Sequence, residues 1–304
     1  MIETPLLFLV FNRPDVSKRV FEQIKLAKPR KLYIASDGAR SNKEGEAEIV
    51  LDLRDFLLKN IDWDCTVSTL FREENLGCKY AVSSAIDWFF HNEEQGIILE
   101  DDCLPEQSFF RYCEELLIKY KNDKRIWHIA GNNFHFGQSD GTNNSYYFGG
   151  IYGSIWGWAS WRDRWAEYDA EIKAFEEDEV RSKLALSYDG SEAVVARFND
   201  FQLIKDGLDT WDFQWVFARW MNKGLTIVPS VNLIKNIGFG EAATHTQYTK
   251  DKRSNMEVEA MSFPLIHPGI VERNASMERQ FYEDFIKLKL LDHTKRFIKK
   301  LVGK

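Results

Sequence analysis

Two hydrophobic patterns alternate along the first third of the chain. Three short apolar runs and one mixed run have the length of strands, and amphipathic segments with helical spacing separate them. These runs predict strands at Leu6–Phe11, Leu32–Ala35, Cys65–Phe71 and Gly96–Leu99. Strands that alternate with helices and are apolar on both faces are typical of a parallel sheet covered by helices on each side. The pattern therefore predicts an α/β fold with a mostly parallel central sheet.

The alternation weakens after a fifth predicted strand at Ile126–Ala130, where glycine, asparagine and aromatic residues become frequent. Tyr146–Phe148 and Leu225–Ile234 have the composition of further strands, and Pro229 indicates a bulge or a sheet edge in the second of them. Trp211–Trp220 has the spacing of a helix. The second half of the sheet is therefore expected to be less regular than the first.

No internal repeat and no linker rich in Pro, Gly or Ser divides the chain. We expect one domain over residues 1–250, with halves at 1–135 and 136–250, followed by a C-terminal extension at 251–304. Between Ile286 and Lys304, seven Lys or Arg residues stand against one Asp. The tail from Met277 to Lys304 predicts a basic amphipathic helix that docks on anionic lipid, and a helix packed on the domain explains the pattern equally well.

The composition is that of a globular protein: 304 residues, 44% hydrophobic and 29% charged. Lys and Arg sum to 40 against 47 for Asp and Glu, so the net charge of −7 argues against nucleic-acid binding. Four cysteines without a C-x-x-C pair indicate reduced thiols. Without a secretion signal or an apolar stretch of about 20 residues, we expect a cytoplasmic protein that contacts the inner face of the cell membrane only peripherally.

Polar residues follow three of the predicted strands. They are Asn12-Arg13, Asp37, and the acidic run Glu100–Asp102. Ligands bind parallel sheets at the carboxyl ends of the strands, and three consecutive acids repel one another unless a cation or hydrogen-bond donors lie among them. Oxygen ligands of this kind suit Mg²⁺ or Mn²⁺. The alternative is that the last two acids cap a helix entering at Pro105.

The chain has no glycine loop for binding phosphate. Neither G-x-x-x-x-G-K-[ST] nor G-x-G-x-x-G follows any predicted strand, which disfavours a P-loop enzyme and a dehydrogenase. A nucleotide diphosphate would then be neutralised in another way, and a divalent cation held by carboxylates is the obvious one. The acidic run therefore points to an enzyme that uses a nucleotide sugar.

A series of short motifs occurs in order between Leu6 and His245. They are Phe11–Pro14, Ala35–Gly38, Asn75–Gly77, Ile98–Asp102, Phe109–Tyr112, Trp127–Asn133, Gly157–Trp158, Thr210–Asp212 and Phe239–Gly240. The first four resemble the nucleotide half of a GT-A glycosyltransferase with its D-x-D-type metal motif. The full series is similar to the N-acetylglucosaminyltransferase I family and related bacterial sugar transferases. The resemblance implies a Rossmann-like GT-A domain with its nucleotide-binding half at 1–135 and its acceptor half at 136–250.

The resemblance also implies roles for residues that bind the donor. Asp37 would contact the base or ribose of the nucleotide, and Asn12 and Arg13 would lie beside that pocket. Glu100 and Asp101 would engage hydroxyl groups of the ribose or the donor sugar. These five residues form the expected donor site.

Metal binding and catalysis are assigned in the same way. Asp102 would be the principal ligand of Mn²⁺ or Mg²⁺, and His245 would complete the metal shell, although a lone His is more often structural. Asp212 matches the family's general base, while its alternative use is to stabilise the dipole of a helix that it begins. Trp158 and Trp211 are candidate platforms for the apolar faces of sugar rings, with core packing as the alternative.

Together these features predict an inverting, metal-dependent glycosyltransferase. It would move a sugar, with N-acetylglucosamine as the candidate, from a UDP-sugar to a glycan or lipid-linked acceptor in bacterial surface polysaccharide synthesis. Two alternatives stay open: a carbohydrate-binding protein whose acids hold calcium, and a sugar nucleotidylyltransferase. The latter normally has a Gly-rich loop after its first strand, and Asn12-Arg13-Pro14 is not that loop.

Overall fold

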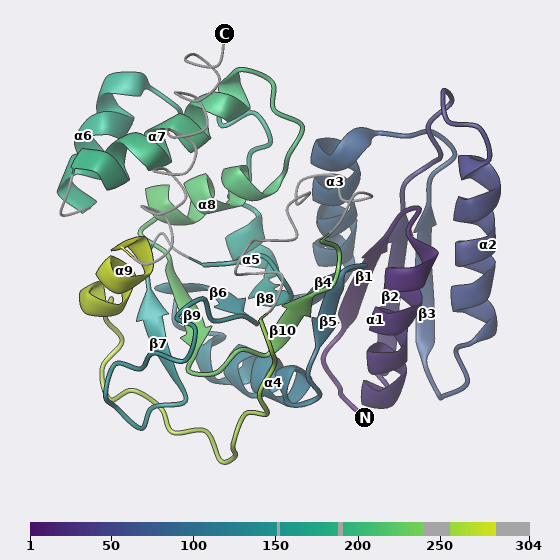
Figure 1. Ribbon diagram of the computed structural model, residues 1–304, viewed down its shortest axis with the longest axis horizontal. Coiled ribbons are helices and arrows are strands. Elements are labelled where there is room, and N and C mark those ends of the chain that lie inside the picture. Colours follow the sequence, from purple (N-terminus) through teal and green to yellow (C-terminus); the bar gives the residue numbers. More distant parts are fainter. Residues whose placement is uncertain (151–152, 188–190, 240–255, 284–304) are drawn as a thin grey trace, which may run out of the picture.

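The computed structural model of the chain describes residues 1–150, 153–187, 191–239 and 256–283. Figure 1 shows a twisted sheet with helices on both of its faces. In the described part of the chain, no helix is long and apolar enough to cross a membrane. The four cysteines form no disulfide.

The first third of the chain alternates strands and helices as the hydrophobic pattern predicts. Its elements are β1 (Leu6–Val10), α1 (Pro14–Ala27), β2 (Lys31–Ser36), α2 (Glu46–Lys59), β3 (Thr66–Phe71), α3 (Gly77–Asn92) and β4 (Gln95–Glu100). The four strands pair in parallel in the order β3-β2-β1-β4. The predicted strands of this region are confirmed to within a few residues, and helices separate them as expected.

The remaining elements complete the sheet and add helices around it. They are β5 (Cys103–Pro105), α4 (Ser108–Tyr120), β6 (Ile126–Ala130), β7 (Tyr146–Gly149), β8 (Trp158–Trp161), α5 (Arg162–Trp165), α6 (Glu177–Ser187), α7 (Ser191–Lys205), α8 (Asp212–Met221), β9 (Leu225–Pro229), β10 (Ile234–Asn236) and α9 (Ala275–Phe281). The sheet continues from β4 through β8, β6 and β9 to β7, and β10 pairs with β5 in a small second sheet.

Strand direction gives the sheet one functional edge. β8 runs antiparallel to both of its neighbours, β4 and β6, so β6 points the same way as β4. β9 is parallel to β6, and β7 is antiparallel to β9. Six of the eight strands described in this sheet therefore end at the same edge, which confirms a mostly parallel α/β fold.

Two apolar layers, one on each face of the sheet, hold the helices. In β1 the side chains of Leu6, Phe8 and Val10 face a cluster with α1, α2 and α4, while Leu7 and Leu9 face α3 and the aromatic residues of α5 and α8. Successive strand residues point to opposite faces, so a strand covered on both sides must be apolar throughout. This is the reason for the unbroken apolar run.

Two expectations need correction, and one strand was not predicted. The helix after the acidic run begins at Ser108, and Pro105 ends the short strand β5, so the last two acids do not cap a helix at Pro105. The run Leu225–Ile234 is not one strand, because β9 ends at Pro229 and Ile234 begins β10 in the second sheet. The sequence pattern also missed β8, whose four residues are all buried and show no alternation.

The described part of the C-terminal extension packs against the second half of the sheet. The Ser145 amide donates to Ile266, and the Asn274 amide donates to the Phe148 carbonyl at 2.8 Å. Met261 and Leu265 belong to the main apolar layer. The basic helix expected from Met277 to Lys304 is described only at its start, where α9 is helical and Met277 is buried, and its remainder from 284 onward lies outside the described residues.

Candidate active site

A cavity of about 620 Å³ opens where the parallel strands end. It brings together eight of the residues predicted from the sequence: Asn12, Arg13, Asp37, Glu100, Asp101, Asp102, Trp211 and Asp212. These residues follow β1, β2 and β4 or stand at the start of α8. The convergence follows from topology, because parallel strands place their carboxyl ends along one edge.

Arg13 lies among the three acids at the end of β4. Its guanidinium forms an ion pair with Asp101 and a second one with Asp102 Oδ2 at 3.0 Å. Arg13 follows β1, which pairs directly with β4, so the neighbouring strand delivers the positive charge. The cation that the acidic run requires is therefore supplied, in part, by the protein itself.

The single positive charge of Arg13 does not neutralise the negative charge of the three acids. Burial raises the pKa of Asp101 to about 6, although the charge of Arg13 acts in the opposite direction. Burial also raises the pKa of Glu100, and the negative charges of Asp102, Asp101 and Asp212 raise it further. The described residues offer no hydrogen bond to the Glu100 carboxylate. A ligand that brings positive charge or hydrogen-bond donors to this edge would be bound favourably.

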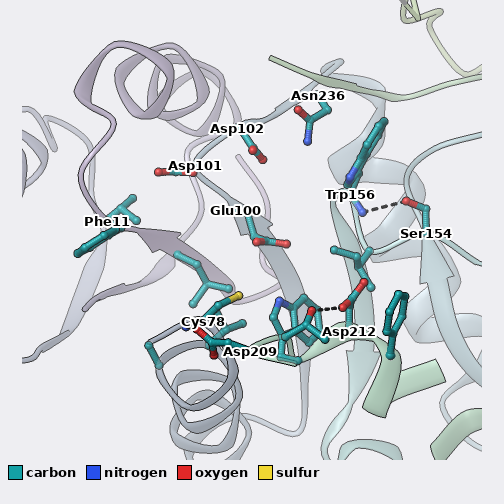
Figure 2. A pocket seen from close by; sticks show the side chains of 18 of the residues that line it. Phe11, Cys78, Glu100, Asp101, Asp102, Ser154, Trp156, Asp209, Asp212 and Asn236 are labelled. Carbon is teal, nitrogen blue, oxygen red and sulfur yellow. Dashed lines mark hydrogen bonds between the residues drawn. The ribbon is translucent and has the colours of Figure 1, made fainter. Parts of the chain in front are cut away.

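Asp212 lies on another wall of the same cavity, as the first residue of α8. Figure 2 shows its carboxylate and that of Glu100 pointing toward the same space. The hydroxyl of Thr210 donates to Asp212 Oδ1, which leaves Oδ2 for another partner. This position at a helix N-terminus suits both the predicted base and the dipole role, so the assignment of Asp212 stays a prediction.

The carboxylate of Asp37 is largely occupied by the protein. It accepts hydrogen bonds from the amides of Leu76 at 3.0 Å and Gly77 at 3.2 Å, and from Asn75 Nδ2 at 2.9 Å. Asp37 therefore ties the end of β2 to the start of α3. This structural use was not foreseen from the sequence, and a contact between Asp37 and the donor nucleotide stays a prediction.

Asn12 is also tied to the fold. Its Nδ2 donates to Glu46 Oε1 at 2.7 Å, and the Arg40 amide donates to Glu46 Oε2 at 2.7 Å. Phe11 and Arg40 extend the same wall of the cavity, with the Arg40 guanidinium 5.5 Å from the centre of the Phe11 ring. This part of the cavity combines an aromatic side chain with positive charge.

Asp209 lines the cavity, belongs to the scaffold, and was missed by the sequence analysis. Its two carboxylate oxygens accept hydrogen bonds from the amides of Cys78 at 3.1 Å and Lys79 at 2.7 Å. These amides belong to the first turn of α3, so Asp209 fastens the loop that carries Asp212 to the first half of the sheet. The partners are 130 and 131 residues apart, and no local sequence pattern could have paired them.

The tryptophans that line the cavity are not all the ones that the sequence predicts. Trp158 has no exposed surface, stacks on Trp211 with ring centres 5.8 Å apart, and does not line the cavity. The expectation that Trp158 is a sugar platform is therefore wrong, because β8 lies in the middle of the sheet and both of its faces are covered. Trp156 lines the cavity instead, with its ring 5.2 Å from that of Phe134.

The described residues contain no group of three or more His, Cys, Asp or Glu side chains placed to hold a metal ion. His245 lies outside these residues. Asp102 nevertheless faces the cavity with 14% of its side chain exposed, beside Asp101. Mg²⁺ usually takes one or two protein carboxylates together with water and substrate phosphates. The residues present therefore fit a divalent cation that a phosphorylated ligand helps to bind.

Comparison with known proteins gave matches among solved structures alone. No family model matches the sequence, and a search of curated proteins found no match. HddC from Yersinia pseudotuberculosis is similar with 11% identity, 54% of this chain and 80% of that chain covered, and a TM-score of 0.33. An apo UDP-glucose pyrophosphorylase is similar with 8% identity, coverage of 77% and 93%, and a TM-score of 0.39. TarS from S. aureus is similar with 12% identity, coverage of 74% and 58%, and a TM-score of 0.37.

Proposed function

We propose that this protein is an inverting glycosyltransferase that takes a sugar from a nucleotide-diphosphate sugar. The observation that carries the proposal is that one cavity joins the acids after β4 to Asp212 at the start of α8. An acid-rich edge suits the cation and diphosphate of a donor, and a carboxylate on another wall suits an attacking hydroxyl group. The ordered motifs that resemble GT-A glycosyltransferases support the same conclusion.

The donor nucleotide is proposed to occupy the part of the cavity beside β1 and β2. Phe11 offers an aromatic surface for a base, and Arg40 and Arg72 line this part of the cavity with positive charge. Arg13 is close enough to the acids to contact the diphosphate without leaving its ion pairs. These contacts replace the glycine loop that the chain lacks.

Asp102, with Asp101 beside it, would hold Mn²⁺ or Mg²⁺ together with the donor phosphates. When bound, the cation would neutralise the negative charge that develops on the leaving diphosphate. The Arg13 guanidinium keeps both carboxylates oriented at the end of β4. Glu100, which has no hydrogen-bond partner in the described part of the chain, would accept hydrogen bonds from hydroxyl groups of the donor sugar.

Asp212 is proposed to act as the general base. Its free oxygen would accept the proton of the acceptor hydroxyl while that hydroxyl's oxygen forms a bond to the anomeric carbon and the bond to the diphosphate breaks. The hydrogen bond from Thr210 fixes the carboxylate during this step. A single displacement of this kind inverts the configuration of the anomeric carbon.

Thermal-shift measurements with a panel of nucleotide sugars, with and without Mn²⁺, test the proposal. A donor that binds the folded protein raises the melting temperature by an amount that grows with its concentration. We expect at least one UDP-sugar to do so more strongly with Mn²⁺, and its transfer product to have the inverted configuration. Retention of configuration would contradict the assignment of Asp212 as the base. Formation of a nucleotide sugar and pyrophosphate from a nucleoside triphosphate would establish a nucleotidylyltransferase instead.

A further inference from the structure

Two neighbouring asparagines after β6 differ completely in their hydrogen bonding. Asn133 Nδ2 donates to the carbonyls of Pro229 at 2.7 Å and Ser230 at 3.1 Å, and its Oδ1 accepts from the His135 amide at 2.7 Å. Asn132 is only 2% exposed, yet among the residues that the structure describes neither its Nδ2 nor its Oδ1 has a hydrogen-bond partner. The first side chain serves the fold, and the second does not.

The backbone that leads into Asn132 is held in place by its neighbours. The residue before it is clamped: the Gly131 amide donates to the Gly157 carbonyl at 2.8 Å, and the Gly131 carbonyl accepts from the Leu233 amide at 3.0 Å. A Cβ at Gly131 would lie 2.6 Å from Ile234, so the backbone is closely packed there. The position of Asn132 is therefore fixed.

The fixed position of Asn132 is in the wall of the cavity. Asn132 is one of the lining residues, and so are Phe134 and Trp156, whose rings meet edge to face. This aromatic pair comes from the two segments that Gly131 and Gly157 join. The wall lies beyond β4 and β8 in the sheet order, away from the strand ends assigned to the donor nucleotide.

We propose that Asn132 and Trp156 form the subsite that binds the acceptor sugar, with the Asn132 carboxamide hydrogen-bonded to sugar hydroxyl groups. This inference rests on the proposed transferase function and identifies where its second substrate binds. A carboxamide offers donors and an acceptor side by side, which matches the hydroxyl groups of a pyranose ring. An indole beside it suits the apolar face of such a ring.

The missing hydrogen bonds of Asn132 favour a ligand over a role in the fold. A buried polar group without a partner destabilises a protein by about 1–3 kcal/mol, and native structures retain such groups rarely. Leu branches at the same carbon as Asn, carries methyl groups in place of the carboxamide oxygen and nitrogen, and so removes the unsatisfied atoms. If Asn132 serves a ligand, its replacement by Leu leaves the melting temperature unchanged or raises it, whereas the same change at Asn133 lowers the melting temperature.

The experiment compares Asn132→Leu and Asn132→Ala with the matched control Asn133→Leu. Thermal melting reports stability, and saturation-transfer NMR reports binding of a panel of methyl glycosides of glucose, galactose, mannose, N-acetylglucosamine and N-acetylgalactosamine. We expect the wild-type protein to bind at least one glycoside, and both Asn132 variants to bind it at least about tenfold more weakly. Their melting temperatures should not fall, while that of Asn133→Leu should.

Three outcomes would overturn the proposal. They are a wild-type protein that binds none of the glycosides, Asn132 variants that bind as the wild type does, and an Asn132→Leu variant that loses as much stability as Asn133→Leu. The last outcome would mean that an internal water or the fold satisfies Asn132. None of these readouts needs the donor, so failure of nucleotide sugars to bind would contradict the proposed function separately.

Discussion

The two sides of the cavity use their polar side chains in opposite ways. On the side formed by β1 and β2, Asp37 accepts hydrogen bonds from amides at the start of α3, and Asn12 donates a hydrogen bond to Glu46. On the side formed by β4 and β6, Glu100 and Asn132 have no hydrogen-bond partner in the part of the chain that the structure describes. A polar residue that lines a cavity can therefore belong either to the scaffold or to a ligand, and its partners tell the two apart.

The difference has an energetic consequence. Removing a group whose partners are protein amides leaves those amides without acceptors, which destabilises the fold. Removing a group without protein partners destabilises little and affects the bound ligand instead. Variants on the two sides of the cavity should therefore separate into losses of stability and losses of activity.

The largest effect is expected for Asp212→Asn. The variant keeps the size of the side chain and removes the proton acceptor, so turnover should fall by about two to four orders of magnitude while donor binding survives. Steady-state kinetics and calorimetric titration with the donor measure the two quantities. Thr210 can still donate to the remaining oxygen, so the melting temperature should change little.

Asp209→Asn is the matched control for that variant. Asp209 lies three residues earlier in the same loop, but its oxygens accept from the Cys78 and Lys79 amides. We expect its variant to lose stability, with activity following the folded fraction. If Asp212→Asn also loses activity only in proportion to its folded fraction, Asp212 belongs to the scaffold and its assignment as the general base is wrong.

Asp102→Ala should weaken both donor binding and turnover, by about a hundredfold, because it removes a ligand of the cation that neutralises the diphosphate. Excess Mn²⁺ should restore part of the loss. Arg13 keeps its ion pair with Asp101 in this variant, so no buried charge is left unpaired. Calorimetric titration of the donor at low and high Mn²⁺ measures the effect. If neither Mn²⁺ nor this substitution changes the donor affinity, Asp102 is not a metal ligand.

Asp37→Ala tests the scaffold side directly. It removes the acceptor for the Leu76 and Gly77 amides, and we expect the free energy of unfolding to fall by about 2 kcal/mol. Asp37→Asn, which retains one acceptor oxygen, should lose less. Urea unfolding measures stability, and donor titration of the folded variant measures affinity. Unchanged stability with weakened donor binding would place Asp37 with the ligand-binding residues, as the sequence resemblance implies.

Three strands of the parallel half, β1, β2 and β4, were predictable because they are buried on both faces. The run Leu6–Phe11 carries this signal without interruption, and Pro14 marks the start of the next helix. The strand Trp158–Trp161 carries no such signal, since four residues are too few to show a period. Its tryptophans resemble sugar platforms in composition, and only the sheet order shows that they are enclosed between β4 and β6.

The candidate site was predictable in its residue types and less so in their use. Consecutive acids such as Asp101 and Asp102 require positive charge, and this requirement is visible in the sequence. That Arg13 meets part of it depends on β1 pairing with β4, which is a property of the topology. The difference between Asn132 and Asn133 depends on contacts with residues about 100 positions away, so no pattern in the sequence distinguishes them.

The smallest effect is expected when the pH is lowered, and it concerns the stability contributed by Glu46 on the side of the cavity formed by β1 and β2. The hydrogen bond from Arg40 lowers the pKa of Glu46 from its ordinary value of 4.5 to about 2, and the Asn12 hydrogen bond contributes to the same shift. Because the pKa is lower in the folded state, the unfolded chain takes up a proton first as the pH falls. Glu46 therefore stabilises the fold fully above pH 4.5, and this contribution is lost between pH 4.5 and pH 2.

Glu46→Gln should remove that contribution. Arg40 is 44% exposed, so solvent screening limits the effect to about 1 kcal/mol at neutral pH. Urea unfolding at pH 7, 4.5 and 3 measures it: the wild type and the variant should differ most at pH 7 and converge as the pH falls. A difference that stays constant over this range would mean that Glu46 acts by packing rather than by charge. In that case the charge of Glu46 would contribute nothing to holding Asn12 in the cavity wall. The side of the cavity formed by β1 and β2 would then contribute less to stability than the hydrogen bonds of Asp37 suggest.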